Sequence, residues 1–84
     1  MMSKALQAAH EVAKEKDSRL RADDPRYGGS VHLTHADGSA FYWANAFVER
    51  QGAWFMVFTE HHGFHVFAAD EIETLIAGTA VRWA

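Results

Sequence analysis

Three short segments of this chain, each carrying a glycine between apolar runs, restrict what it can fold into. The segments HADGS, ERQGA and EHHGF place Gly38, Gly52 and Gly63 after two residues that tolerate the helical region of backbone space. A glycine in that position can adopt the left-handed conformation that closes a tight hairpin. The segments therefore predict three β-hairpin turns, each with a positive φ at its glycine.

The apolar residues between these turns recur with a period of two, which is typical of β-strands. Because consecutive hairpins make neighbouring strands, we expect an antiparallel meander with the strand order 1-2-3-4. The first and fourth strands would then lie about 14 Å apart, so His32 and His35 could not share a metal ion with His65. The predicted four-stranded meander covers 30–68, with strands near 30–35, 40–49, 53–59 and 64–68.

Signals near both ends of the chain predict helices. Ser3 is suited to cap a helix whose apolar residues recur at helical spacing, and the region ends before a proline at position 25. Asp70, followed three residues later by Glu73, matches the capping-box pattern of a second helix. We expect a single α+β domain over 1–84, with an N-terminal helix in 1–24, a short C-terminal helix over 70–78, and a tail at 79–84 that alternates enough to add a fifth, edge strand.

Charge and composition argue against several classes of function. Positions 1–26 carry six basic and five acidic side chains, whereas positions 27–84 carry two basic and six acidic ones. A groove that follows nucleic-acid phosphates needs clustered Lys and Arg, so direct nucleic-acid binding is not expected. The chain has no cysteine, which excludes disulfides and thiolate metal sites. It has no run of about 18 apolar residues, so we expect a soluble, cytoplasmic protein with no membrane partner.

One cluster of metal-ligating residue types lies at the third turn, where Glu60, His61, His62 and His65 fall within six positions. Imidazole and carboxylate groups are ligands that zinc prefers. Turn histidines usually point away from a sheet, whereas a residue on the strand stands perpendicular to it. We therefore interpret these residues mainly as parts of a hairpin, and keep a metal-binding protein or small metal-dependent enzyme as the alternative.

Other catalytic signatures are missing from the sequence. No serine lies in the strand-to-helix elbow that serves a nucleophile, and the glycine-containing segment RYGGS lacks the lysine and the spacing of a phosphate loop. We therefore expect neither enzymatic activity nor a cofactor.

Large apolar residues occupy both faces of the predicted strands, although an antiparallel sheet with one face in water should alternate apolar and polar residues. If each helix covers one face, these residues are simply core. If the slender helices cover less, part of an aromatic face is left for a partner. One face carries Val31, Leu33, Phe41, Trp43, Phe47, Phe55, Val57 and Phe67, and the other Tyr42, Ala44, Ala46, Val48, Trp54, Met56, Phe58, Phe64 and Val66.

We therefore predict a non-enzymatic protein-interaction module. Its expected partner is a second copy, through isologous contact of the same face, or a larger protein that it regulates or inhibits. Acidity would also suit a mimic of nucleic-acid charge, of the kind that phage-encoded inhibitors of host defence can be. The predicted partner-binding residues are Tyr42, Val48, Trp54, Met56 and Phe58.

Overall fold

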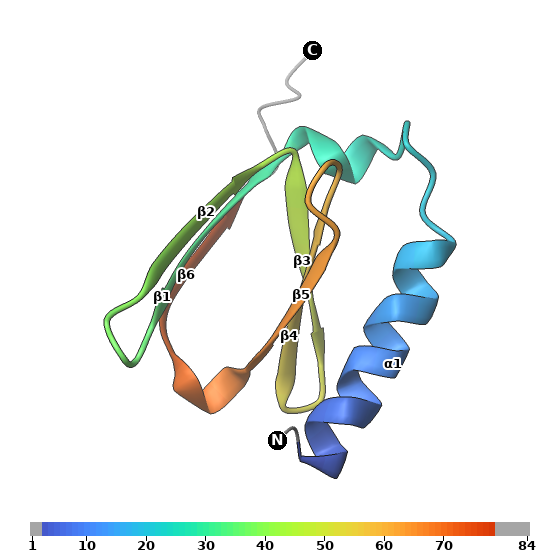
Figure 1. Cartoon of the computed structure of the whole chain (residues 1–84). Coiled ribbons are helices and arrows are strands. Elements are labelled where there is room, and N and C mark those ends of the chain that lie inside the picture. The colour runs from blue at the N-terminus through green and yellow to red at the C-terminus, as the bar shows by residue number, and fades with distance from the viewer. Residues whose placement is uncertain (1–2, 79–84) are drawn as a thin grey trace.

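The computed structural model describes residues 3–78, in which one α-helix packs beside two small β-sheets (Figure 1). Helix α1 covers Lys4–Ser18. The prediction of its cap is confirmed, because the side-chain oxygen of Ser3 accepts a hydrogen bond from the backbone N–H of Leu6 at 3.0 Å. After α1 the chain passes through a short 3₁₀ helix, η1, over Pro25–Gly28, which Asp24 caps.

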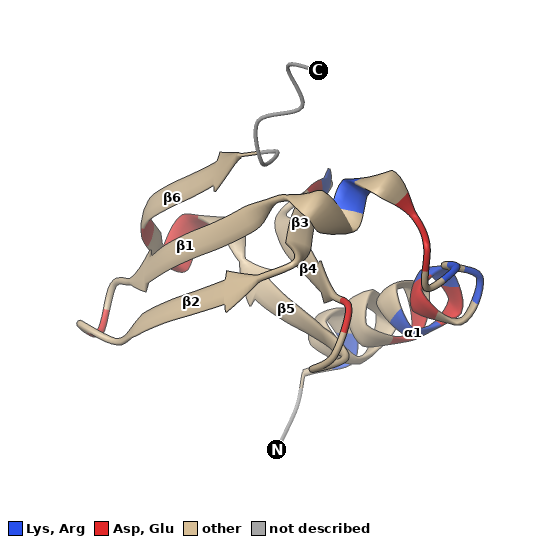
Figure 2. Ribbon diagram, turned by 90° about the horizontal axis from the view of Figure 1, so that it is seen from above, with Lys and Arg blue, Asp and Glu red and all other residues tan. Residues whose placement is uncertain are grey.

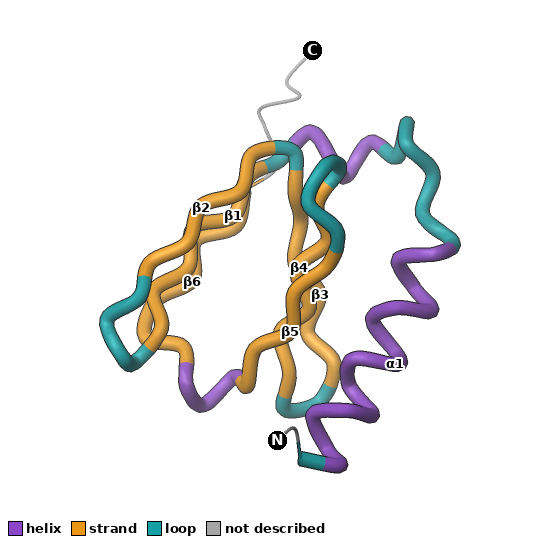
Figure 3. The backbone as a smooth tube through the Cα atoms, viewed as in Figure 1, coloured by secondary structure: helices purple, strands orange, loops and turns teal. Residues whose placement is uncertain are grey.

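The strands form two three-stranded antiparallel sheets that face each other (Figure 3). Sheet A has the order β2-β1-β6, and sheet B has the order β3-β4-β5. The predicted α+β class with antiparallel pairing is therefore confirmed. The strands are β1 Ser30–His35, β2 Ala40–Ala44, β3 Ala46–Gln51, β4 Trp54–Thr59, β5 Phe64–Ala68 and β6 Ile72–Gly78.

The predicted continuous strand over 40–49 is wrong, because the chain turns at Asn45. Asn45 has a φ of 54°, in the left-handed region that asparagine tolerates better than most residues. Its carbonyl accepts a hydrogen bond from the N–H of Glu60 at 3.0 Å, which ties the turn to the β4–β5 connection. As a result β2 stays in sheet A and β3 begins sheet B, so the four-stranded meander is replaced by two sheets.

The predicted helix over 70–78 is also wrong. The chain makes a single 3₁₀ turn, η2, over Ala69–Glu71 and then continues as β6. β6 pairs with β1 and places Ile76 opposite His32. Alternating β-branched residues suit a strand. Hydrogen bonding to the free edge of β1 stabilises this strand more than the capping residues stabilise a helix. The strand predicted over 79–84 lies outside the described residues.

The three glycine turns are confirmed. Gly38, Gly52 and Gly63 have φ values of 95°, 57° and 73°. Their loops differ in length, since the residues between strands are 36–39, 52–53 and 60–63. The glycine sets the backbone conformation of each turn, and the pairing of the flanking strands sets its length.

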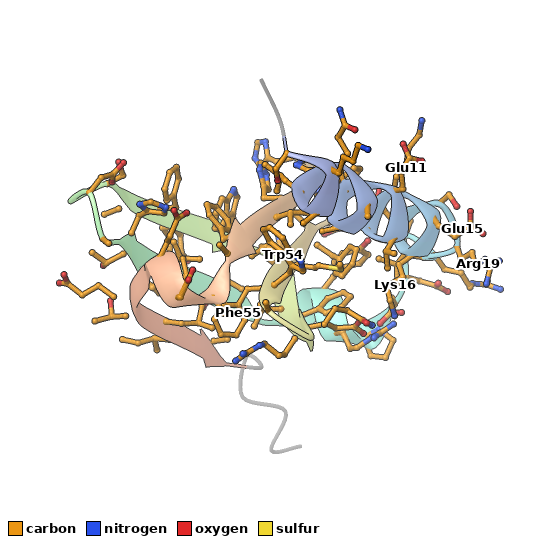
Figure 4. The ribbon with its side chains drawn as sticks, turned by 90° about the horizontal axis from the view of Figure 1, so that it is seen from below. Glu11, Glu15, Lys16, Arg19, Trp54 and Phe55 are labelled. Atoms are coloured by element: carbon orange, nitrogen blue, oxygen red, sulfur yellow. The ribbon has the colours of Figure 1, made fainter. Side chains whose placement is uncertain are left out.

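Sheet B lies between two cores. The first core fills the space between the sheets, and its buried residues are Val31, Ala46 and Val57. The second lies between sheet B and α1, where alanines on the helix allow a close approach. Figure 4 shows Trp54 on the α1 side of β4 and its neighbour Phe55 on the other side. The buried residues of the second core are Ala9, Ala13, Tyr27, Met56 and Phe58.

The two faces of strand β3 are exchanged relative to the prediction, so each face packs on the other core. Phe47 lies opposite Phe58 in the register, and Val48 lies opposite Val57. Because directly opposite residues share a face of a ladder, Phe47 packs on the helix-side core and Val48 on the core between the sheets. The turn at Asn45 resets the alternation, since a shift of one residue exchanges the two faces of a strand.

Candidate interaction surface

The face of sheet A that points away from sheet B is bare over the described part of the chain (Figures 1 and 2). Val31 and Leu33 of β1 are buried towards sheet B, so the alternate residue His32 points outward. The register aligns His32 with Tyr42 on β2 and Ile76 on β6. This surface, which we call the sheet A outer face, consists of Ser30, His32, Thr34, Ala40, Tyr42, Ala44, Thr74, Ile76 and Gly78.

A central row of three large side chains crosses the sheet A outer face. Tyr42 is 58% exposed and Ile76 is 68% exposed, and the rings of Tyr42 and His32 lie 4.3 Å apart. The rows on either side are small, with Thr34 between Ala40 and Thr74 on one side. The face is thus a low ridge of two apolar side chains and one imidazole, flanked by small residues.

The sheet A outer face carries no Asp, Glu, Lys or Arg. Figure 2 shows β1 and β2 without a charged residue, whereas charges gather on α1 and on the loops. On β6, Glu73 lines a depression with Arg50 and Phe55 of sheet B, so it belongs to the inner side of sheet A. When a partner removes apolar groups without neighbouring charges from water, the free energy of the system falls.

An aromatic seam closes the gap between β2 and β5, where the two sheets meet without backbone pairing. The ring of Trp43 stacks on His65 with centroids 4.8 Å apart, and Phe41 stacks on Trp43 at 5.5 Å. Phe67 packs against Phe41 at 5.5 Å from the side of β5. Phe41 nevertheless stays 39% exposed.

The structure places the five predicted partner-binding residues in three different environments. Met56 and Phe58 are each 1% exposed in the core beneath α1, and Trp54 packs against the same core. Val48 packs between the sheets. Among these five, Tyr42 alone lies on the sheet A outer face, so a partner could reach it without displacing α1 or separating the sheets.

The structure separates the Glu60, His61, His62 and His65 cluster. Glu60 and His61 approach each other at the turn, with Oε1 and Nε2 3.5 Å apart. The backbone N–H of His62 donates to the hydroxyl of Thr59 at 2.7 Å, while His65 points into the seam. Within residues 3–78 no group of three histidine, aspartate or glutamate side chains could hold a metal ion. The arrangement is that of a hairpin turn.

His65 is the most unusual titratable group in the seam. Burial lowers the pKa of its imidazole, while a hydrogen bond with the backbone of His62 opposes that effect. Its Nε2 is buried and has no hydrogen-bond partner among residues 3–78. A protonated His65 would place a charge among aromatic rings, so the neutral form fits the folded state.

Away from the aromatic seam, an ion-pair network surrounds Glu49 of β3. One carboxylate oxygen lies 3.2 Å from Nζ of Lys16, and the other accepts a hydrogen bond from Arg26 at 3.0 Å. Arg26 also donates to Asp24, which lowers the pKa of that carboxyl, and its guanidinium lies over the Phe47 ring at 4.4 Å. These contacts join α1, η1 and β3, which gives the network a structural role.

A groove of about 670 Å³ lies beside this network, between β3 and the end of β6. Its lining includes Phe47, Val48 and Gly78, and its charged members are Arg26 and Glu49. Because those two side chains are paired with each other, neither is held ready for chemistry on a substrate.

Comparison with known proteins does not assign a function. No protein-family model matches this chain, and no match was found among curated proteins or solved structures. In the described part of the chain, no helix combines the length and the apolar character needed to cross a bilayer. The proposal of a function therefore rests on the geometry of the surface.

Sequence reasoning missed two residues of the sheet A outer face, namely His32 and Ile76, and also the exposure of Phe41 beside the aromatic seam. The sequence predicts a helix over 70–78, which contains Ile76, and groups Phe41 with Val31 and Leu33 on one apolar strand face. The signal that could have found Ile76 is the alternation of Ile72, Thr74 and Ile76, which has the period of a strand.

Proposed function

We propose that this chain is a non-enzymatic protein-interaction module whose binding surface is the sheet A outer face. The observation that carries the proposal is an uncharged sheet face on which Tyr42 and Ile76 are exposed on either side of His32. A contiguous apolar patch on the surface of a small protein usually marks an interaction site. By covering a surface on its partner, the module would regulate or inhibit that partner.

The contrast with the rest of the molecule supports this choice of surface. The face of sheet B that points away from sheet A is rich in large apolar residues, and α1 packs on it. The charged residues around Glu49 are engaged in ion pairs, and the histidines of the third turn serve the hairpin. A metal-dependent activity would need ligands brought together, and residues 3–78 do not provide such a group.

The proposal is tested by placing the same charge on and off the surface. Ile76→Lys puts an ammonium group in the central row of the sheet A outer face, on β6, where burial under a partner without a counter-charge is strongly unfavourable. Val12→Lys is the matched control, since Val12 is an exposed apolar residue on α1, at 43%. Immobilised wild-type protein and the two variants are compared for partner capture from lysate, with far-UV circular dichroism as the check of folding.

We expect Ile76→Lys to be folded and to lose at least tenfold in capture, while Val12→Lys behaves as the wild type. Equal capture by a folded Ile76→Lys protein would refute the assignment of the surface. Loss in both variants would show that binding depends on the overall charge of the protein, or uses α1 as well.

A further inference from the structure

Strand β2 exposes large apolar side chains on both of its faces. Tyr42 is 58% exposed on the sheet A outer face, and Phe41 is 39% exposed on the side of the aromatic seam. A partner that lay flat on the outer face would cover Tyr42 and leave Phe41 in water. A strand placed alongside the edge of β2 would cover both.

The edge of β2 is open to such pairing. β2 is the terminal strand of sheet A, and within residues 3–78 no strand pairs with its other side. Edge strands are commonly protected by charged residues, prolines or bulges. β2 has none of these, and it pairs with β1 over five consecutive residues without a register shift.

The other edge strands differ from β2 in these respects. β3 carries Glu49 and Arg50, and β6 carries Glu73 at a register shift against β1. β5 contains His65 and lies beside α1 (Figure 2). β2 is therefore the edge best suited to an added strand.

The backbone groups of β2 that point to the free edge follow from the hairpin. The N–H of His35 donates to the carbonyl of Ser39 at 2.8 Å. Bonded and non-bonded pairs alternate along an antiparallel ladder, so the next bonded pairs are Leu33 with Phe41 and Val31 with Trp43. The N–H and C=O groups of the intervening residues, Ala40, Tyr42 and Ala44, consequently point towards solvent.

The sequence of β2, AFYWA, is symmetric in character about Tyr42. It has alanine at both ends, an aromatic residue next to each alanine, and tyrosine at the centre. An antiparallel copy centred on Tyr42 would place small residues opposite small ones and aromatic rings opposite aromatic rings. Aromatic cross-strand pairs are among those that stabilise a sheet.

We propose that a second copy of this chain pairs with β2, in antiparallel orientation and with Tyr42 opposite the partner's Tyr42. This inference goes beyond the proposed function, because it concerns the edge of β2. Pairing there leaves Ile76, on the opposite edge strand β6, uncovered. Phe41 would then lie opposite the partner's Trp43, and the outward N–H and C=O groups would bond across a two-fold axis. The two three-stranded sheets A become one continuous sheet.

Charge favours a second copy at this position. The chain has a net charge of −3, so two copies carry a small net repulsion. β1 and β2 contain no charged residue, so this part of sheet A can meet its own copy without opposing like charges. A partner with a strongly acidic or basic strand would leave its charges unpaired here.

The experiment measures the mass of the protein by sedimentation equilibrium and the exchange of single backbone amides by NMR. We expect a reversible dimer with a dissociation constant on the order of 10–100 µM, because the contact is small. In the monomer the Tyr42 and Ala44 amides point to solvent and exchange quickly. In the dimer they are hydrogen-bonded, so their exchange should slow at least tenfold as the protein concentration rises.

Two proline variants provide the matched comparison. Ala44→Pro removes an outward N–H that the β1–β2 ladder does not use, and should give a folded monomer. Ala77→Pro removes the corresponding outward N–H at the edge of β6, where Ala77 lies opposite Val31, and should leave the dimer intact. Circular dichroism confirms folding in both cases, and amide exchange in the wild type tests the pairing without any substitution.

The outcomes separate this inference from the proposed function. If the wild type is monomeric at every concentration but Ile76→Lys still loses partner capture, the second-copy inference is overturned and the binding surface stands. If Ala44→Pro then also loses capture, the edge binds an extended segment of another protein. If the wild type is monomeric and Ile76→Lys captures normally, both proposals fail.

Discussion

The two sheets of this protein differ in how many of their faces are covered within the described residues. Met56 and Phe58 of sheet B are 1% exposed, because sheet A covers one face of sheet B and α1 covers the other. Tyr42 and Ile76 of sheet A stand in solvent, because only the inner face of that sheet is covered within the described residues. An apolar strand face is core or binding surface according to whether a further layer lies on it.

The chain connection explains which sheet receives the helix. η1 joins α1 to β1, and Tyr27 of η1 packs into the core beneath α1, with its ring 5.7 Å from Phe47. The Lys16 and Arg26 pairs with Glu49 hold helix, loop and β3 together. Small residues on α1, Ala9 and Ala13, fit closely against sheet B. One helix covers one sheet face, so within residues 3–78 the outer face of sheet A remains bare.

The largest expected effect comes from truncating one apolar residue on each sheet. Phe58→Ala removes a fully buried ring and leaves a cavity under α1, which should lower the free energy of unfolding by about 3–5 kcal/mol. Ile76→Ala removes a side chain that is already in water, and should cost less than about 1 kcal/mol. Urea denaturation of the two variants measures the difference. Similar losses would show that the outer face of sheet A is covered in solution.

A smaller effect is expected at Asn45, the residue that separates the two sheets. Its positive φ would strain a β-branched residue, so Asn45→Val should lower the free energy of unfolding by about 1–2 kcal/mol. Asn45→Gly, which relieves that conformation, should be within about 0.5 kcal/mol of the wild type. Both values come from chemical denaturation. Equal stability of the two variants would mean that the chain does not need a left-handed turn between the sheets.

The smallest expected effect concerns His65, in the seam where the two sheets meet. Burial lowers the pKa of this imidazole in the folded state, so the unfolded chain binds a proton first as the pH falls. Stability should therefore decrease below the unfolded value, near about 6.5, down to the lower folded pKa. Thermal unfolding at pH 7.5 and pH 5.0 should show a smaller decrease for His65→Phe, which keeps a ring against Trp43.

The control for this pH effect is His61→Gln, which removes an exposed histidine from the same turn. That variant keeps His65 in place, so the loss of stability attributed to the buried imidazole should persist. If the stabilities of His65→Phe and His61→Gln depend on pH in the same way, the buried imidazole of His65 does not cause the loss of stability at low pH.

Local signals determined a large part of the fold before any tertiary contact was known. The Ser3 cap, the period-two strands and the positive φ at Gly38, Gly52 and Gly63 all appear in the structure. Each depends on a few neighbouring residues, whose steric and hydrogen-bonding preferences act within one turn of chain. The sequence also shows large apolar residues on both faces of the strands, but it leaves open whether helices cover both faces.

Only the tertiary structure decided how those strands divide into sheets. Asn45 could have continued a strand, and Asp70 could have capped a helix; the pairing of β3 with β4 and of β6 with β1 settled both. Distant partners supply those free energies, so no local pattern contains them. The same long-range choice buried Met56 and Phe58, left His32 and Ile76 in water, and so defined the candidate binding surface.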